Sequence, residues 1–154
     1  MREPKSVPDL LSSRLLRLSN TLGLYSSRRY RSQFGVALPE WRVLSIIALQ
    51  ETTSAREISR TLATDKAWVG QTVRKLERRG FVRRVLDKRD ARRTLINLTR
   101  QGKQVHDAIM ANALRRQKRL LDCLGHDEAA RLIAGLNRLQ AEADRMLEEL
   151  DASD

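Results

Sequence analysis

Residues 80–99, GFVRRVLDKRDARRTLINLT, contain two short apolar runs on either side of a dense charged loop. The runs lie at 82–86 and 94–98 and are rich in valine, isoleucine and leucine. Such runs, separated by a polar loop, are typical of an antiparallel hairpin. The sequence therefore predicts a two-stranded β-hairpin that carries arginines toward a polyanion.

The positive charge of the chain is concentrated around this hairpin. Residues 66–93 hold eleven Lys and Arg against three Asp and Glu, a net charge of +8, and the whole chain carries +11. Such a basic surface is typical of nucleic-acid binding, because each phosphate neutralised by Lys or Arg releases condensed counterions. Charge alone leaves a solubilising surface, a membrane or an acidic partner open.

Composition favours a mainly α-helical protein in the cytoplasm. Of 154 residues, 41% are hydrophobic, which is enough for one core, and only 4% are aromatic. No stretch approaches the roughly 18 uncharged apolar residues of a membrane span, and the N-terminus lacks a signal-peptide core. We therefore expect no membrane partner. The single cysteine, Cys123, excludes an internal disulfide and fits a reducing compartment.

Two amphipathic helices are expected in the first fifty residues. From residue 9 to about 31, apolar side chains recur at spacings of four and three on one helical face. These are Leu11, Leu15, Leu18, Leu22 and Tyr25. The next helix spans 38 to about 50, where Pro39 suits the first turn and Glu40 complements the helix dipole.

Two shorter helices come before the hairpin. The first opens after an N-cap at Thr53 or Ser54, with Glu57 at the capping-box position. The second spans 66 to about 79 and ends at Gly80. It is capped by Thr64 or Asp65 and buries Val69, Val73 and Leu76. Helix, turn, helix and hairpin in this order predict a winged helix-turn-helix.

Long helices are also expected after the hairpin. Thr99 caps one that runs toward Leu124, and the last begins near Asp127 with a four-three apolar repeat. A small lobe cannot cover the apolar stripes of both chain ends, so we expect a two-fold homodimer, with a monomeric bundle as the alternative. The predicted fold is mainly α (α+β), a winged helix-turn-helix with a two-stranded β-wing. Residues 1–37 plus 100–154 form its helical dimerisation lobe, and 38–99 its DNA-binding lobe.

A longer motif resembles a known family. Residues 87–93, DKRDARR, followed by Leu98, Thr99 and Gly102, are similar to the wing signature Asp-x-Arg-Asp-x-Arg, then Leu-Thr-x-x-Gly, of the MarR family of transcriptional regulators. The resemblance is close over about 38–102 and extends to the flanking helices by layout. It implies a homodimer that binds a pseudo-palindromic double-stranded DNA operator and usually represses transcription.

The resemblance assigns roles in the wing. Arg92 matches the family's wing-tip arginine, expected in the minor groove, where a narrow A·T-rich groove attracts a guanidinium. Arg89 and Arg93 are expected to contact DNA as well. Asp87 and Asp90 are expected to orient Arg89, Arg92 and Arg93 by ion pairing. Solvation without a DNA contact is the alternative for Lys88 and Arg93.

The helix over 66–79 departs from the common family pattern. Gln71 can bond adenine in the major groove, and Ala67 and Thr72 can meet a thymine methyl, which suggests an A·T-leaning half-site. Trp68 either contacts DNA or folds over the lobe's own surface. The expected phosphate contacts, which position without reading sequence, are Ser54, Arg56, Lys66, Arg74 and Lys75.

The resemblance also implies an effector, either a small aromatic acid or phenol, or an oxidant sensed by cysteine. Candidate ligand residues are Tyr25, Arg29, Trp41 and Arg42, which supply an aromatic wall and a carboxylate partner. The alternatives are a core role for Trp41 and surface positions for the arginines. We expect Cys123 to be a buried, inert thiol.

No enzyme, cofactor or metal site is predicted. His106 and His126 stand apart, without a Cys or acidic cluster at ligand spacing, and no nucleophile and base pair or phosphate-binding glycine loop occurs. The sequence thus predicts a sequence-specific transcriptional regulator, a repressor released from its operator by an aromatic acid or thioester. The alternative is a constitutive or architectural winged-helix DNA-binding protein without an effector.

Overall fold

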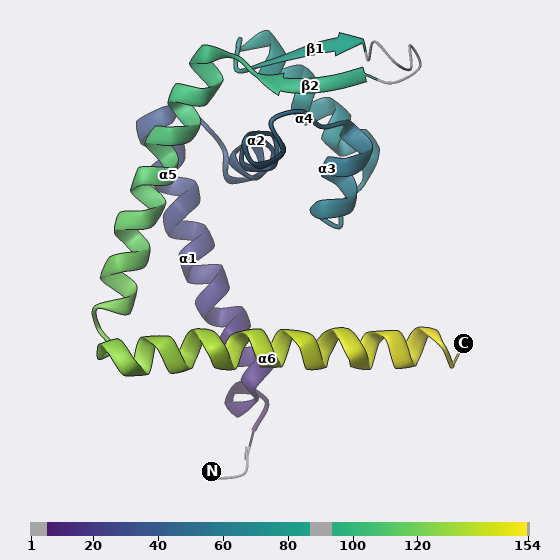
Figure 1. Ribbon diagram of the computed structural model, residues 1–154. Coiled ribbons are helices and arrows are strands. Elements are labelled where there is room, and N and C mark those ends of the chain that lie inside the picture. Colours follow the sequence, from purple (N-terminus) through teal and green to yellow (C-terminus); the bar gives the residue numbers. More distant parts are fainter. Residues whose placement is uncertain (1–5, 87–93, 154) are drawn as a thin grey trace. The chain divides into compact units, whose positions relative to one another are not determined.

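The computed structural model describes residues 6–86 and 94–153. In these ranges the elements are η1 (Val7–Asp9), α1 (Leu11–Phe34), α2 (Leu38–Gln50), α3 (Ala55–Thr61), α4 (Lys66–Arg78), β1 (Val82–Leu86), β2 (Thr94–Leu98), α5 (Arg100–Leu121) and α6 (His126–Asp151) (Figure 1). This order confirms the predicted fold class, a mainly helical chain with a winged helix-turn-helix. The chain divides into two units, Met1–Met110 and Ala111–Asp154.

The first unit holds the hydrophobic core, with α2 at its centre. This helix packs against α1, α3, α4 and β2, and its Val43, Leu44, Ile46 and Ile47 are buried. Ile58 of α3 is also buried, as are Val69, Val73 and Leu76, the residues predicted to be buried on α4. Tyr30 of α1 and Ile109 of α5 complete the same core.

Local caps define where the two short helices begin and end. Ser54, not Thr53, is the N-cap of α3: its Oγ accepts the Glu57 N–H at 3.3 Å, while Glu57 Oε2 accepts the Ser54 N–H at 2.8 Å. Asp65 caps α4 by accepting the Trp68 N–H at 2.9 Å. Gly80 follows that helix with φ 72°, a left-handed conformation that costs glycine little.

Thr53 instead extends the hairpin. β1 and β2 pair antiparallel, with Val82 opposite Leu98. On the other side of β2, Thr53 donates its N–H to Ile96 O at 3.2 Å and accepts the Ile96 N–H at 2.7 Å. The segment between α2 and α3 is therefore joined to the wing by backbone hydrogen bonds.

The Leu-Thr-x-x-Gly motif fixes the junction between wing and α5. Thr99 Oγ1 donates to Gly80 O at 2.6 Å and accepts the Gly102 N–H at 3.0 Å. A Cβ on Gly102 would stand 1.8 Å from Phe81 O, so only glycine allows this approach. The motif thus ties the start of α5 to the end of α4.

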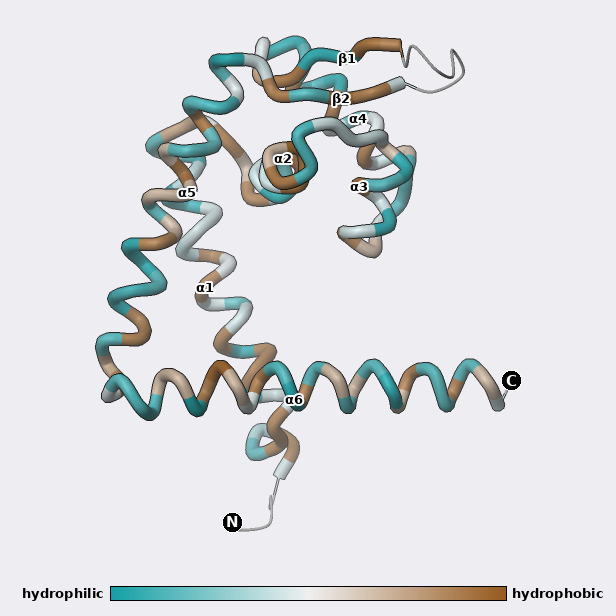
Figure 2. Tube along the Cα trace, in the orientation of Figure 1, coloured by the Kyte–Doolittle hydropathy of each residue, from teal (hydrophilic) through white to brown (hydrophobic). Residues whose placement is uncertain are grey.

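Apolar side chains remain exposed on the helices at both chain ends. On α1 these include Leu11, Leu15 and Leu18, and on α6 Leu132, Leu139, Met146 and Leu150. Hydrophobic residues recur along both helices (Figure 2). No helix in the described part of the chain is long and apolar enough to cross a membrane.

The prediction of a buried Cys123 is wrong. Cys123 is exposed: α5 ends at Leu121, and the thiol lies in the turn that follows. Its Sγ donates to Leu120 O at 2.9 Å.

Candidate nucleic-acid interface

The solvent face of α4 carries most of the predicted base and phosphate contacts. Its exposed residues include Lys66, Ala67, Gln71, Arg74 and Lys75. The opposite face packs into the core through valine and leucine. An α-helix about 10–12 Å across fits the major groove, roughly 12 Å wide, so this face can meet base edges.

The predicted outward position of Thr72 is wrong. The residue is only 8% exposed. It lies three residues after Val69 and four before Leu76, spacings that put it on the buried side of the helix. Its methyl group therefore belongs to the core face, and a contact with thymine is not open to it in this arrangement.

Trp68 is partly buried and packs against the core. Of the two alternatives expected for Trp68, this arrangement favours the one in which it folds over the lobe's own surface. Beside it, a Cβ built on Gly70 would stand 3.7 Å from Arg74 Nη1, an ordinary van der Waals contact.

The α3 candidates differ in how available they are. Arg56 is exposed. Ser54 is half-buried, and its hydroxyl serves the cap: it donates to Glu57 Oε2 at 3.0 Å and accepts that residue's N–H. Ser54 therefore has a structural task independent of its predicted phosphate contact.

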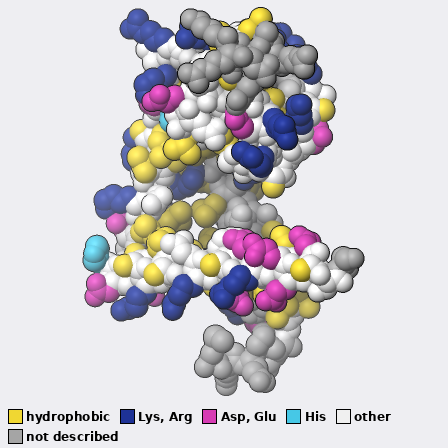
Figure 3. All heavy atoms as spheres, turned by 45° about the vertical axis from the view of Figure 1, so that its right-hand side comes forward, with side chains coloured by type: hydrophobic (Ala, Val, Ile, Leu, Met, Phe, Trp, Pro, Cys, Tyr) yellow, Lys and Arg dark blue, Asp and Glu magenta, His cyan; other side chains and the backbone are white. Residues whose placement is uncertain are grey.

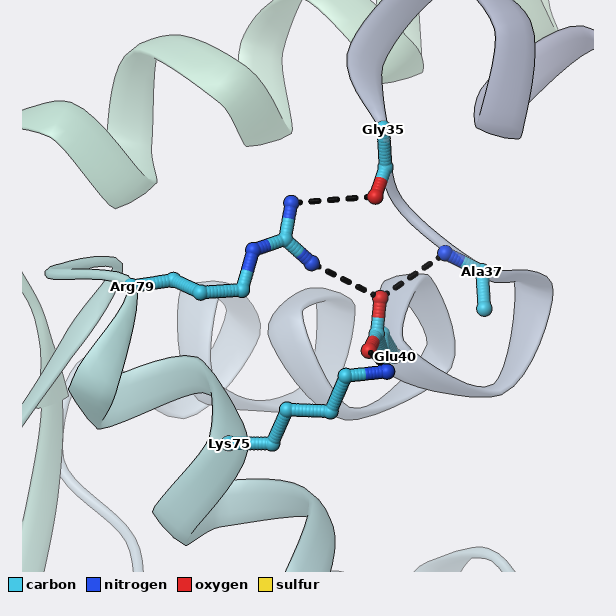
Figure 4. Close-up of polar contacts among 5 residues, drawn as sticks. All are labelled: Gly35, Ala37, Glu40, Lys75 and Arg79. Atoms are coloured by element: carbon cyan, nitrogen blue, oxygen red, sulfur yellow. Dashed lines mark hydrogen bonds and ion pairs between the residues drawn. The ribbon is translucent and has the colours of Figure 1, made fainter.

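A buried carboxylate anchors the C-terminal end of α4 (Figure 4). Glu40 in the first turn of α2 is 4% exposed, and its Oε1 lies 2.6 Å from Lys75 Nζ. Its Oε2 meets Arg79 Nη1 at 3.1 Å and accepts the Ala37 N–H at 2.8 Å. Arg79 also donates through Nη2 to Gly35 O at 3.0 Å. Lys75, a predicted phosphate contact of α4, and Arg79, the residue after that helix, are thus both bound to the start of α2.

The protonation of Glu40 follows from these contacts. Burial raises the pKa of this carboxyl, but the hydrogen bonds from Lys75 and the Ala37 N–H and the charges of Lys75 and Arg79 outweigh burial. The net pKa lies below its ordinary value. Glu40 therefore stays ionised at neutral pH and holds both cations.

A second ion pair joins α4 to the wing. Arg84 on β1 donates through Nε to Glu77 Oε2 at 2.8 Å. This hydrogen bond is the main reason that the pKa of Glu77 is lowered. The predicted wing-tip residues Asp87, Arg89, Asp90, Arg92 and Arg93 lie outside the described residues. Lys and Arg side chains are spread over the face of the first unit seen in Figure 3.

The predicted ligand residues fall into two groups. Tyr25 and Arg29, one turn apart on α1, line a shallow hollow with Thr21, Leu24, Arg28 and Ser32. Trp41 instead packs edge-on against Tyr30, with ring centres 6.0 Å apart, and lies 5.0 Å from the His106 ring. Arg42 is exposed. Within residues 6–86 and 94–153, no three His, Cys, Asp or Glu side chains are grouped to hold a metal.

Sequence reasoning missed the contacts of Glu40 with Lys75 and Arg79 and the hydrogen bonds from Asn97 of the wing to the segment between α2 and α3. Glu40 was assigned only to the helix dipole, and the four-residue spacing of Lys75 and Arg79 was the one signal that two cations share a face. Nor was Asn97 noticed, whose Nδ2 donates to Glu51 O at 3.0 Å and Thr52 Oγ1 at 2.7 Å. These contacts join residues more than thirty positions apart, which periodicity does not reveal.

A capped helix-turn-helix with a solvent-facing second helix, followed by an antiparallel hairpin, defines a winged-helix DNA-binding protein. The family model described as "MarR family" matches residues 34–93. A MarR/EmrR family transcriptional regulator from Acinetobacter sp. ADP1 is 32% identical, with a TM-score of 0.76 over 87% of this chain and 94% of that one. The chain belongs to the MarR family of DNA-binding transcriptional regulators.

More distant solved structures share the fold. FabT from Streptococcus pneumoniae, solved in complex with DNA, is 19% identical, with a TM-score of 0.80 over 88% of this chain and 96% of FabT. PcaV from Streptomyces coelicolor, solved in complex with its natural ligand, is 22% identical, with a TM-score of 0.72 over 92% of this chain and 99% of PcaV. A search of curated proteins gave no match.

Proposed function

We propose that this regulator is a repressor that binds a pseudo-palindromic operator as a homodimer and is released by a small aromatic acid or thioester. The observation that carries the proposal is the solvent face of α4, where Ala67, Gln71 and Arg74 are exposed on a capped, core-anchored helix. Because the regulator is proposed to bind operator DNA, we propose that it acts in the cytoplasm.

Homodimer formation is supported by the unpartnered apolar residues of α1 and α6. Leu18 and Met146, for example, are 54% and 62% exposed. Apolar side chains that recur along one helix and stay in contact with water mark an interaction surface. We propose that residues 1–37 and 100–154 supply this dimerisation lobe, while 38–99 supply the DNA-binding lobe. Sedimentation should then give a dimer at micromolar concentration, and a monomer would contradict the two-half-site proposal.

Repression by an operator complex is tested by footprinting. The protein should protect a DNA site with two half-sites about one helical turn or a multiple apart, and its affinity should fall steeply with salt. FabT's complex with DNA supports the proposal for this chain through their shared fold. Transcription from the protected promoter should rise when the protein is removed. A fall would make it an activator.

The wing-tip contact is tested by Arg92→Ala. We expect this variant to lose operator affinity sharply while it stays a folded dimer, because its guanidinium is proposed to enter the minor groove. Unchanged affinity would remove Arg92 from the interface. Arg93→Ala tests the neighbouring predicted contact in the same way: a loss of operator affinity would support a DNA contact there, and unchanged affinity would favour solvation.

Effector release is supported by two observations. PcaV has been solved with a natural ligand, and here Tyr25 and Arg29 line one hollow, placing an aromatic ring beside a cation. A panel of aromatic acids and their coenzyme A thioesters should include a compound that lowers operator affinity and raises thermal stability. If no compound changes either quantity, the alternative of a constitutive or architectural DNA-binding protein is favoured.

A further inference from the structure

The Glu40 cluster, formed by Glu40, Lys75, Arg79, Gly35 and Ala37, joins the C-terminal end of α4 to the start of α2 and the segment before it. One carboxylate oxygen of Glu40 contacts Lys75 of α4 at 2.6 Å, and the other contacts Arg79, the residue after α4, at 3.1 Å. Arg79 extends the connection to Gly35 O, and its guanidinium carbon lies 4.6 Å from the centre of the Phe81 ring. The end of α4 is therefore held to the start of α2, and Arg79 also packs on Phe81, the residue before β1.

Lys75, which contacts Glu40, lies on the same side of α4 as the exposed Gln71. At 3.6 residues per turn, Lys75 lies about 40° around the helix from Gln71 and about 20° from Trp68. A rotation of α4 by about 20° would move a side-chain atom about 6 Å from the axis by roughly 2 Å. Base-edge hydrogen bonds do not tolerate such a displacement, since functional geometries hold within about 0.5 Å.

The cluster also determines what Lys75 can do. Its ammonium is paired with a carboxylate that is itself 4% exposed, so releasing the lysine to a phosphate would leave a buried charge without its closest partner. The predicted phosphate contact at Lys75 thus competes with an existing ion pair. Arg74, one position earlier and exposed, has no such conflict with Glu40 and remains the better phosphate candidate.

We propose that Glu40 is a positioning residue for base reading, which fixes the rotation of α4 through Lys75 and Arg79 and thereby aims Gln71. The inference rests on the proposed operator binding. Glu40 adds a negative charge to a DNA-binding lobe. If charge were its only effect, its removal should raise affinity for operator and random DNA alike. If Glu40 positions α4, its removal should instead lower affinity for the operator relative to affinity for random DNA.

The test measures binding of the dimer to the footprinted operator and to a scrambled duplex across a salt series. Glu40→Gln and Lys75→Met should each lower the ratio of operator to scrambled affinity about tenfold, the scale of one lost base contact. The double variant should lose little more than either single variant, because both remove one interaction. The charge-matched control is Glu51→Gln, an exposed position in the same lobe, and its ratio should equal that of the wild type.

Two results would overturn the proposal. One is an unchanged affinity ratio in Glu40→Gln. The other is a Lys75→Met variant that keeps the ratio but lowers the slope of log affinity against log salt by about 0.9, as loss of one phosphate contact would. In that case Lys75 contacts DNA directly.

Hydrogen exchange in the free protein provides a readout that needs no operator. Amides of residues 75–80 should exchange faster in Glu40→Gln, while those buried in α2 should keep their protection. Unchanged exchange at 75–80 would also overturn the positioning role. If the wild-type protein protects no DNA site, the proposed function fails, and the exchange result still decides whether Glu40 fixes α4.

Discussion

Gly102→Ala isolates the contact that joins the wing to α5. The added Cβ would stand 1.8 Å from Phe81 O and 2.7 Å from Phe81 C, both backbone atoms. An ordinary carbon–oxygen contact is about 3.3 Å, so α5 and the Phe81 backbone must separate by about 1.5 Å. Phe81 cannot easily yield, because its N–H donates to Leu76 O at 2.9 Å and its carbonyl accepts the Thr99 N–H at 3.0 Å.

The energetic cost follows from the bonds that this separation breaks. Loss of the Thr99 to Phe81 hydrogen bond costs about 1 kcal/mol, and loss of the Thr99 cap on α5 about 1 kcal/mol more. A buried carbonyl left unpaired adds about 1–3 kcal/mol. Alanine returns about 1 kcal/mol through its higher helix propensity. We expect the free energy of unfolding to fall by about 3 kcal/mol, which lowers Tm by roughly 6–12 °C.

The assay is urea and thermal unfolding, with Gly135→Ala as the matched control. Outside its own helix, no described atom lies within 4 Å of a Cβ built on Gly135, so the same substitution there meets no obstacle in the chain. We expect it to stabilise α6 by up to about 1 kcal/mol. If Gly102→Ala is as stable as the wild type, the close approach of α5 to Phe81 is not a constraint and the explanation of the Leu-Thr-x-x-Gly motif fails.

Three further predictions concern a cap, a pH dependence and a buried threonine. Ser54→Ala should lower the free energy of unfolding by about 1 kcal/mol, because α3 loses its capping box; unchanged stability in urea would contradict the cap. The lowered pKa of Glu40 means that its stabilising effect is present above the ordinary carboxyl pKa and is lost as the pH falls through the lower folded value. Acid should therefore destabilise the wild type more than Glu40→Gln in thermal scans, and equal pH profiles would exclude this role. Thr72→Val should leave operator affinity unchanged, while Gln71→Ala should weaken it. An equal loss of operator affinity in both variants would show that Thr72 contacts DNA.

The element order was predictable because its signals are local. The hairpin strands lie at 82–86 and 94–98, as the two apolar runs predict, and α2 spans the expected 38–50. Glycine after α4, a capping residue before each short helix and the three-four spacing of buried residues all act within a few positions. These signals need no knowledge of the rest of the fold.

The candidate site was predictable only in part. Helical spacing placed Ala67, Gln71 and Arg74 on the solvent side, where the structure has them. Helical spacing did not decide whether Thr72 is buried. Thr72 lies at the edge of the buried face that holds residues 69, 73 and 76, and packing against the neighbouring helices determines how wide that face is. The prediction for Cys123 was wrong for a related reason: it lies two residues past the end of α5, where helical periodicity no longer applies.

By itself, the sequence determined the helices, the hairpin and the concentration of positive charge, since each depends on neighbours along the chain. Only the tertiary structure decided which charges remain for DNA. Lys75 and Arg79 belong to the same basic stretch as Arg74, yet they meet Glu40, thirty-five and thirty-nine positions earlier in the chain. Ion pairs across such separations form only when packing brings a carboxylate and a cation within a few ångströms of each other.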